Sequence, residues 1–237
     1  MAPRAVFFDM DDTLLDGHSA MQVSWELVCH EAATGLGCEA ERLRLAIRRE
    51  ANAFWKDEAA VGHWRLNLDG AREQVVRLAL EAEGLDSGRA RQIAVDYRQR
   101  HRDNLRLFDD ALETLQLVRA AGLRVGLITN GDSPLQRDKI ERFDLARRLD
   151  VIVIEGEFGK GKPERAIFEH AVAAVGVRAE EAWHVGDNLY ADVGGAKAAG
   201  LHAVWVHRER LELREDVPVL PDRTIAHLPE LRAALGL

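Results

Sequence analysis

Short apolar runs that alternate with helical segments constrain the fold of this 237-residue chain more than any other feature. Runs of strand length lie at 5–8, 124–128, 150–154, 182–185 and 203–206, and helical periods separate the later ones. Strands that alternate with helices predict a mostly parallel sheet covered by helices on both faces. The sequence therefore predicts an α/β fold with a Rossmann-like, three-layer core, which binds ligands beyond the carboxyl ends of its strands.

Residues 17–105 break this alternation, because their apolar residues follow helical periods throughout. We expect four helices there, the first with its apolar stripe through Met21, Trp25, Val28 and Ala32, and they interrupt the sheet domain directly after its first strand. We therefore predict a core domain of residues 1–16 and 106–237. The inserted residues 17–105 are predicted to form a helical, four-helix-bundle-like cap domain near the carboxyl end of the first strand.

Charge and composition narrow the class of partner. The formal net charge of −8 argues against nucleic acid, because nucleic-acid binders usually display a basic face. The apolar runs are far shorter than the roughly 20 residues that a bilayer requires. Cys29 and Cys38 lack the spacing of metal ligands and fit free thiols in a reducing compartment. With no visible targeting segment, we expect a cytoplasmic monomer or homodimer that binds neither nucleic acid nor a membrane.

Three aspartates, Asp9, Asp11 and Asp12, follow the first apolar run. Carboxylates this close repel one another unless a cation lies among them, and hard divalent cations prefer oxygen ligands. The alternative is a solvated acidic turn, since the pattern by itself is only moderately specific. Its position at the end of a predicted strand favours a metal site.

Thr129, Asn130 and Gly131 end the second apolar run. A hydroxyl beside exposed backbone N–H groups can bind a phosphoryl oxygen, as turns and helix starts bind anions. The same three residues are also good turn chemistry, so this motif alone fits a plain strand-to-turn junction equally well.

Lys162 lies between a glycine and Pro163, ahead of a predicted helix. Its ammonium is a point charge that can pair with a phosphate and with a carboxylate. Lys160 is the competing lysine. We favour Lys162 because Pro163 fixes the backbone that follows it, whereas Lys160 is expected on the surface of the loop.

Asp187 and Asp192 follow the fourth apolar run. Asp187 is expected to reach a metal from the turn, and Asp192 to hold Lys162 or the water shell of the metal. For Asp187 alone, helix capping is the better explanation. Because all four motifs follow strands of one parallel sheet, however, they converge on one edge of that sheet.

Four segments, FFDMDDTLLD, LITNGD, GKGKPERAIF and HVGDNLYAD, occur here in the order and spacing of the haloacid dehalogenase superfamily. The chain resembles the phosphatase branch whose helical cap lies between the first and second motifs. The resemblance runs from Ala5 to about His207 and includes Gln136 and Lys139 in the helix after the second motif. The cap resembles the family by position and helical character only, and Asp12 stands where many relatives carry glycine or asparagine.

The resemblance implies a phosphatase that hydrolyses a small-molecule phosphate monoester through an aspartyl-phosphate intermediate on Asp9. Asp11 would be the general acid and base, which protonates the leaving oxygen and then activates water. Thr129 and Lys162 would bind the transferring phosphoryl group. The remaining candidates for phosphate binding and loop orientation are Thr13 and Asn130.

The resemblance also implies Mg²⁺ as the cofactor. The metal would be held by the Asp9 side chain, the backbone carbonyl of Asp11 and Asp187, with Asp192 in support. Phosphate monoesters hydrolyse very slowly in water, so the site must both neutralise charge and align the attacking oxygen. Mg²⁺ and Lys162 would supply the charge.

Other reactions use the same core. A dehalogenase is disfavoured by Asp11, because relatives that displace halide lack this aspartate and need no metal. A phosphomutase would return the phosphoryl group to its substrate, and only cap residues would distinguish it. A phosphonate hydrolase needs a cap lysine that forms a Schiff base, and nothing marks Lys56, the only lysine of residues 17–105, for that role. The presence of every catalytic residue type argues against a non-catalytic binding protein.

Substrate choice is expected to depend on the cap. Aromatic residues with basic neighbours flank the break between the second and third predicted cap helices, and the candidate substrate contacts are Trp55, His63 and Arg65. The alternative, slightly favoured, is that Trp55 and Trp64 pack the cap against itself.

Overall fold

The computed structural model describes residues 3–57, 62–208 and 219–237. The chain forms two compact units, Met1–Asp16 with Leu107–Leu237, and Gly17–Arg106. The helical unit therefore ends at Arg106, one residue after the expected end at residue 105. Residues 58–61, in the break between the second and third predicted cap helices, lie outside the described residues, as do residues 209–218.

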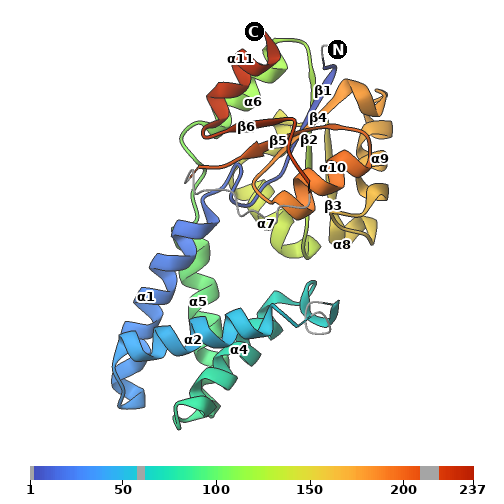
Figure 1. The fold of residues 1–237 in the computed structure, drawn as a ribbon. Helices are drawn as coiled ribbons and strands as arrows, with labels where there is room; N and C mark the ends of the chain where they lie inside the picture. The colour runs from blue at the N-terminus through green and yellow to red at the C-terminus, as the bar shows by residue number, and fades with distance from the viewer. Residues whose placement is uncertain (1–2, 58–61, 209–218) are drawn as a thin grey trace. The chain divides into compact units, whose positions relative to one another are not determined.

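The first unit contains a six-stranded sheet in which every neighbouring pair is parallel (Figure 1). The predicted α/β fold is confirmed. The strand order is β3-β2-β1-β4-β5-β6, so the chain leaves β1 toward one side of the sheet and later returns to the other. A ligand site is expected where the order reverses, between the carboxyl ends of β1 and β4. The strands are β1 (Ala5–Phe8), β2 (Arg124–Thr129), β3 (Val151–Ile154), β4 (Ala182–Gly186), β5 (His202–Val206) and β6 (Arg223–Ile225).

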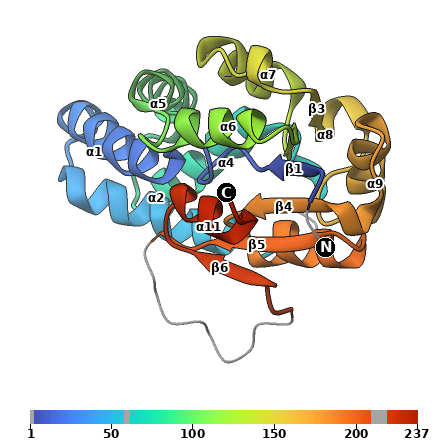
Figure 2. The ribbon, with the colours of Figure 1, turned by 90° about the horizontal axis from the view of Figure 1, so that it is seen from above.

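Helices cover both faces of this sheet (Figure 2). On one face α6 (Ala111–Ala120) contacts α11 (Leu231–Leu235), and on the other α9 (Arg165–Ala174) contacts α10 (Gly195–Ala198). Apolar side chains of adjacent strands form the core with α9, among them Phe7, Ile128, Val153, Ile167 and Phe168. The remaining elements of this unit are α7 (Ser133–Arg142), α8 (Glu155–Phe158), the π-helix η4 (Leu189–Gly194) and the 3₁₀ turns η2 (Ala146–Arg148), η3 (Ala179–Glu181) and η5 (Leu228–Glu230).

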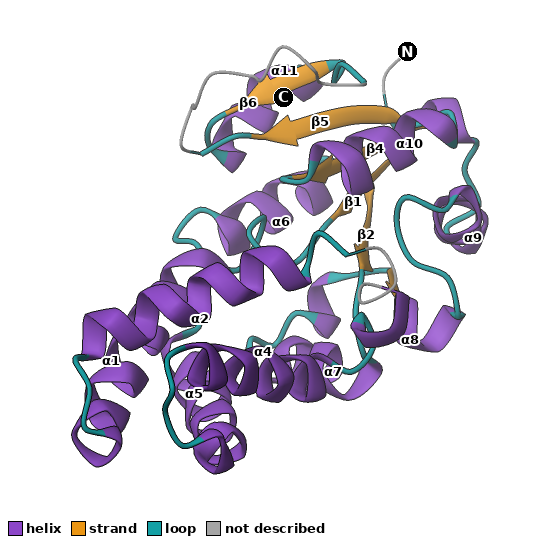
Figure 3. Ribbon diagram, turned by 60° about the horizontal axis from the view of Figure 1, so that its bottom comes forward, coloured by secondary structure: helices purple, strands orange, loops and turns teal. Residues whose placement is uncertain are grey.

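The described part of the second unit is helical (Figure 3). Its long helices are α1 (Gly17–Leu36), α2 (Ala40–Phe54), α4 (Leu68–Ala82) and α5 (Ala90–Asn104), with a 3₁₀ turn η1 (Ser87–Arg89) before α5. Their shared apolar core includes Val28, Leu43, Val76, Leu80, Ile93 and Tyr97. Met21, expected on the buried stripe of α1, is 38% exposed, because that stripe runs through Ala20, Ser24 and Val28. The role of this unit as a cap stays a prediction.

None of the helices in the described residues combines the length and the apolar character needed to cross a membrane.

Candidate active site

The loop after β1 places Asp9 at the carboxyl end of the central strand. The Asp9 backbone N–H donates to the carbonyl of Val185 on β4 at 2.9 Å, which ties the loop to the neighbouring strand. Asp12 adopts a φ of 60°, the left-handed conformation that glycine and asparagine favour and aspartate tolerates. The turn therefore forms with an aspartate at the position where the resemblance led us to expect glycine or asparagine.

A buried ion pair joins the first and third motifs. The Lys162 ammonium donates to Asp9 Oδ1 at 2.5 Å and to Asp192 Oδ1 at 2.6 Å. Lys162 is only 3% exposed, whereas Lys160 is exposed. Burial alone would lower the pKa of Lys162, but the carboxylates of Asp192 and Asp9 more than offset it and raise that pKa above its usual range. The lysine is therefore charged where a phosphate would need it.

The second motif positions that lysine. The Asn130 side chain accepts from the Lys162 backbone N–H at 2.7 Å and donates to the Lys162 carbonyl at 2.8 Å. Both ends of the amide are thus engaged with the backbone of Lys162. This contact positions Lys162, and the expected contact of Asn130 with a phosphate stays a prediction.

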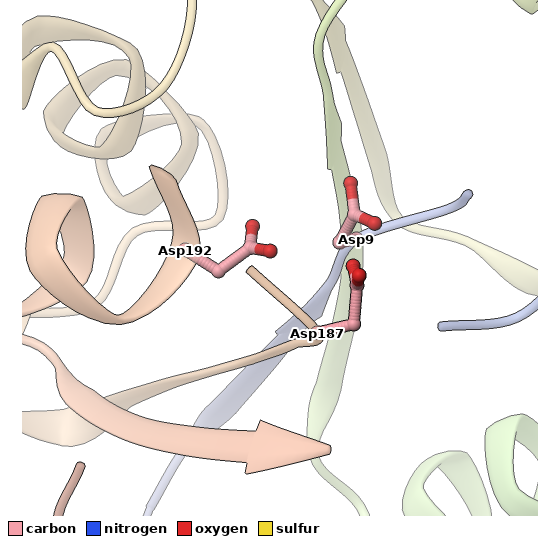
Figure 4. Close-up of side chains that lie close together, drawn as sticks. All are labelled: Asp9, Asp187 and Asp192. Carbon is pink, nitrogen blue, oxygen red and sulfur yellow. The ribbon is translucent and has the colours of Figure 1, made fainter. Parts of the chain in front are cut away.

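Three carboxylates, those of Asp9, Asp187 and Asp192, offer oxygen atoms within 4.8 Å of one another (Figure 4). Burial raises the pKa of Asp9 to about 7, with Lys162 acting in the opposite direction. Burial and the neighbouring Asp9 raise the pKa of Asp187 to about 8. Ionised carboxylates this close and this buried require a cation, and an all-oxygen set suits a hard divalent ion such as Mg²⁺.

Asp192 is held by more partners than the other two carboxylates. Besides Lys162, His184 Nε2 lies 2.9 Å from its Oδ1, and the Asn188 N–H donates to its Oδ2 at 3.0 Å. Burial alone would raise the pKa of Asp192, but Lys162 and His184 hold it well below its usual range. Gly186 leaves room for this carboxylate, because a Cβ there would lie 2.3 Å from Asp192 Cγ. Both of its oxygens are engaged by the protein, and its expected role in support of the metal stays a prediction.

The carboxylate of Asp11 lies against α7. Lys139 Nζ donates to both of its oxygens at 2.8 Å, and Gln136 Nε2 donates to Oδ2 at 3.0 Å. Gln136 Nε2 also donates to Thr129 Oγ1 at 2.6 Å. The buried Thr129 hydroxyl accepts this bond and donates to the Asn130 carbonyl only at a long 3.4 Å, so little is lost if its hydrogen turns to a phosphoryl oxygen.

Thr13 is fully buried, and its hydroxyl has no hydrogen-bond partner within the described ranges. Its backbone carbonyl accepts from the Arg208 guanidinium at 3.1 Å. This contact fixes the backbone of the loop at Thr13, and the orienting and phosphate-binding roles of Thr13 stay predictions.

The candidate substrate contacts Trp55, His63 and Arg65 belong to the helical unit. Trp55 is 39% exposed and packs edge-on against Phe54 at 5.1 Å between ring centroids. His63 packs edge-on against Trp64 at 4.8 Å, and Trp64 lies 6.3 Å from Phe54. These aromatic side chains thus contact one another within their own unit, and their contact with a substrate stays a prediction.

Two residues on strands support the site but were missed as functional positions. The Trp205 indole N–H on β5 donates to the Asp187 carbonyl at 2.7 Å and so fixes the loop of this candidate ligand. His184 lies on β4 within the fourth apolar run; burial lowers its pKa, so a neutral ring donates to Asp192. Both lie in apolar runs, where only a tertiary contact distinguishes them from core residues.

Residues 3–200 match the family model of haloacid dehalogenase-like hydrolases. The chain belongs to this family of hydrolases, and the predicted superfamily is confirmed.

Relatives of this chain include enzymes of more than one chemistry. It is 35% identical to a phosphoserine phosphatase of Thermus thermophilus over 99% of this chain and 100% of that protein. A solved phosphatase of this family from Thermococcus onnurineus is 27% identical, with a TM-score of 0.70 over 98% of both chains. A solved 2-haloacid dehalogenase from Pseudomonas syringae is 28% identical, with a TM-score of 0.65 over 99% of this chain and 98% of that one. The residues of this chain must therefore decide between the reactions.

Proposed function

We propose that this chain is a Mg²⁺-dependent phosphatase that hydrolyses a small phosphate monoester through an aspartyl phosphate on Asp9. The observation that carries the proposal is the arrangement around Asp9, where one ammonium and two further carboxylates surround a single buried carboxylate. Asp11, which relatives that displace halide are expected to lack, argues against attack on carbon. Attack by one anion on another needs positive charge on both sides of the transferred group, and Lys162 with a metal among the carboxylates provides it.

In the first half-reaction an Asp9 oxygen attacks phosphorus, and the bond between phosphorus and the ester oxygen breaks. Lys162 holds Asp9 in place and balances the charge of the phosphoryl oxygens, while the Thr129 hydroxyl donates to one of them. Asp11, protonated at this stage, gives its proton to the departing alkoxide. The products of this step are the free alcohol and the aspartyl phosphate.

In the second half-reaction Asp11, now a carboxylate, takes a proton from water whose oxygen attacks phosphorus. The bond to Asp9 breaks, which releases inorganic phosphate and restores both aspartates. The residues that would hold the metal are Asp9, Asp187 and the backbone carbonyl of Asp11, with Asp192 in support. Bound Mg²⁺ supplies positive charge to the phosphoryl oxygens.

The test is phosphate release from a panel of phosphorylated metabolites, phosphoserine among them, with Mg²⁺ present. Asp9→Asn is expected to lower kcat by at least about 10,000-fold, because no nucleophile remains. Asp12→Asn, in the same loop, removes a carboxylate while keeping a residue that tolerates positive φ, and kcat should stay within about tenfold. Equal activity of wild type and Asp9→Asn would contradict the proposal.

Two further measurements separate the alternatives. Halide release from a 2-haloacid by the wild type, without phosphate release from any ester, would establish the dehalogenase. Isomerisation of a sugar phosphate would establish the mutase.

A further inference from the structure

Helix α7 presents two side chains to the carboxylate of Asp11. Lys139 Nζ lies 2.8 Å from both oxygens, and Gln136 Nε2 lies 3.0 Å from Oδ2. Residues three positions apart lie on one face of a helix, so a single rigid element supplies all of these donors. Both oxygens of Asp11 are therefore held from one direction.

These contacts differ from an ordinary surface ion pair. Gln136 is 3% exposed and the side chain of Lys139 is 19% exposed, while the Asp11 side chain, 38% exposed, keeps a face open to a substrate. Arg137, on the same helix, has a side chain that is 48% exposed, and it pairs with Glu157 of α8 at 2.6 Å. A largely buried ammonium needs an acceptor to offset its lost hydration, and Asp11 is that acceptor.

Gln136 also connects Asp11 to the phosphate side of the site. Its Nε2 lies 3.0 Å from Asp11 Oδ2, 2.6 Å from Thr129 Oγ1 and 2.8 Å from the Asn130 carbonyl. An amide nitrogen carries two hydrogens, so these three acceptors compete for them. The orientation of Asp11 is thus coupled to that of the hydroxyl proposed to bind phosphate.

We infer that Lys139 and Gln136 are positioning residues that fix the Asp11 carboxyl group for proton transfer, and this rests on the function proposed above. In that reaction Asp11 gives one proton to the ester oxygen and takes one from water. Lys139 and Gln136 gain and lose none. Their contribution is to restrict the orientations of Asp11, as partners of catalytic groups generally do.

Leaving-group dependence tests the inference. We would compare Lys139→Met with Arg137→Met, which breaks an exposed ion pair on the same helix. The measurement is the single-turnover release of the leaving group from p-nitrophenyl phosphate and from an alkyl phosphate hydrolysed by the wild type. An alkoxide needs the proton of Asp11 and nitrophenolate does not, so Lys139→Met should slow the alkyl ester about 10- to 100-fold and the nitrophenyl ester less than about threefold. Arg137→Met should change neither by more than about twofold.

The double variant with Asp11→Ala sharpens this test. If Lys139 acts through Asp11, Lys139→Met should slow the alkyl ester no further once Asp11 is absent. An equal loss with both esters, or a loss that adds to that of Asp11→Ala, would show a merely structural role and overturn the inference.

Urea unfolding of the wild type, Lys139→Met, Asp11→Ala and the double variant tests the contact between Lys139 and Asp11 without any substrate. The two single substitutions should lower the unfolding midpoint by amounts that do not add in the double variant, because the pair is lost only once. Additive midpoints would overturn the inference. If the wild type hydrolyses no phosphate ester, the proposed function is wrong. The unfolding measurements still decide whether Lys139 of α7 holds Asp11.

Discussion

The two units of the chain bury different chemistry. In the α/β unit, buried charged side chains collect where the strands end, and they include Asp9, Lys162 and Asp192. In the described part of the helical unit, the buried polar residue is Ser24, whose hydroxyl donates to the Ala20 carbonyl at 2.6 Å. Buried charge destabilises a fold unless it is paired, so a cluster of buried charged side chains indicates a functional site.

The ion pairs show the same contrast. Arg42 pairs with Glu83 on the surface of the helical unit, where the arginine side chain is 59% exposed. The side chains of Lys162 and Asp192 are each only 2% exposed. Exposed pairs contribute little to stability, and removing one partner of a buried pair leaves an uncompensated charge. The comparison predicts that substitutions at the site affect activity and stability together, while those in the apolar core of the helical unit affect stability alone.

Lys162→Met should have the largest effect of the substitutions that test this comparison. It leaves Asp9 and Asp192 buried without their ammonium, so the free energy of unfolding of the metal-free chain should fall by about 3–5 kcal/mol. Loss of charge at the phosphoryl group should lower kcat by at least about 100-fold. Urea unfolding and phosphate release measure the two effects. Lys160→Met, at an exposed lysine two residues away, is the control and should change neither.

Leu43→Ala tests the helical unit. Leu43 is fully buried in the core of α1, α2, α4 and α5, so its truncation should lower the free energy of unfolding by about 2–5 kcal/mol. Leu45, 50% exposed on the same helix, gives the matched control, and Leu45→Ala should change it by less than about 0.5 kcal/mol. Phosphate release at 25 °C should match the wild type in both. A fall in kcat for folded Leu43→Ala protein would break the comparison, because it would tie the packing of the helices to the chemistry.

The parts of the fold that depend on local pattern could be predicted from the sequence. Alternating apolar runs predicted the parallel sheet. The residues that directly follow strands include Asp9 and Asp187, and they could be brought together in advance because the carboxyl ends of parallel strands lie at one edge of the sheet. Met21 was placed on the wrong stripe of α1. That helix contacts both α2 and α5, so its buried face is set by two neighbours and a single apolar period does not define it.

The contacts that organise the site could not be predicted, because they join residues far apart in the sequence. Lys139 and Asp11 are separated by 128 positions, and the Asn130 side chain meets the Lys162 backbone across 32. Turn chemistry explained Asn130 equally well, and a lysine on a helix has no distinguishing local signal. Trp205 lies within an apolar strand, where its hydrogen bond to the Asp187 carbonyl is invisible to any pattern of hydrophobicity.

Asp187→Asn tests how much the repulsion and burial of the carboxylate cluster lower the free energy of unfolding. Burial and Asp9 raise the pKa of Asp187 to about 8, against about 4 in an unfolded chain. Between these values the folded chain binds more protons than the unfolded one, so metal-free wild type should lose stability as the pH rises from about 4 to about 8. Without this carboxylate, that part of the loss disappears. The variant should therefore be about 1–3 kcal/mol more stable than metal-free wild type at pH 9, less than the full pKa shift implies because solvent reaches part of the side chain.

The smallest expected effect is the change in melting temperature when Mg²⁺ is added to the wild type and to Asp187→Asn. A cation that binds only the folded chain should raise the melting temperature of the wild type by a few degrees at pH 8, and by less at pH 5, where protons compete for the same oxygens. Asp187→Asn should show little of this rise at either pH. Thermal unfolding with Mg²⁺ and with EDTA measures it. An equal rise in both proteins would mean that the cation binds elsewhere, and the buried carboxylates at the ends of β1 and β4 would then need another explanation.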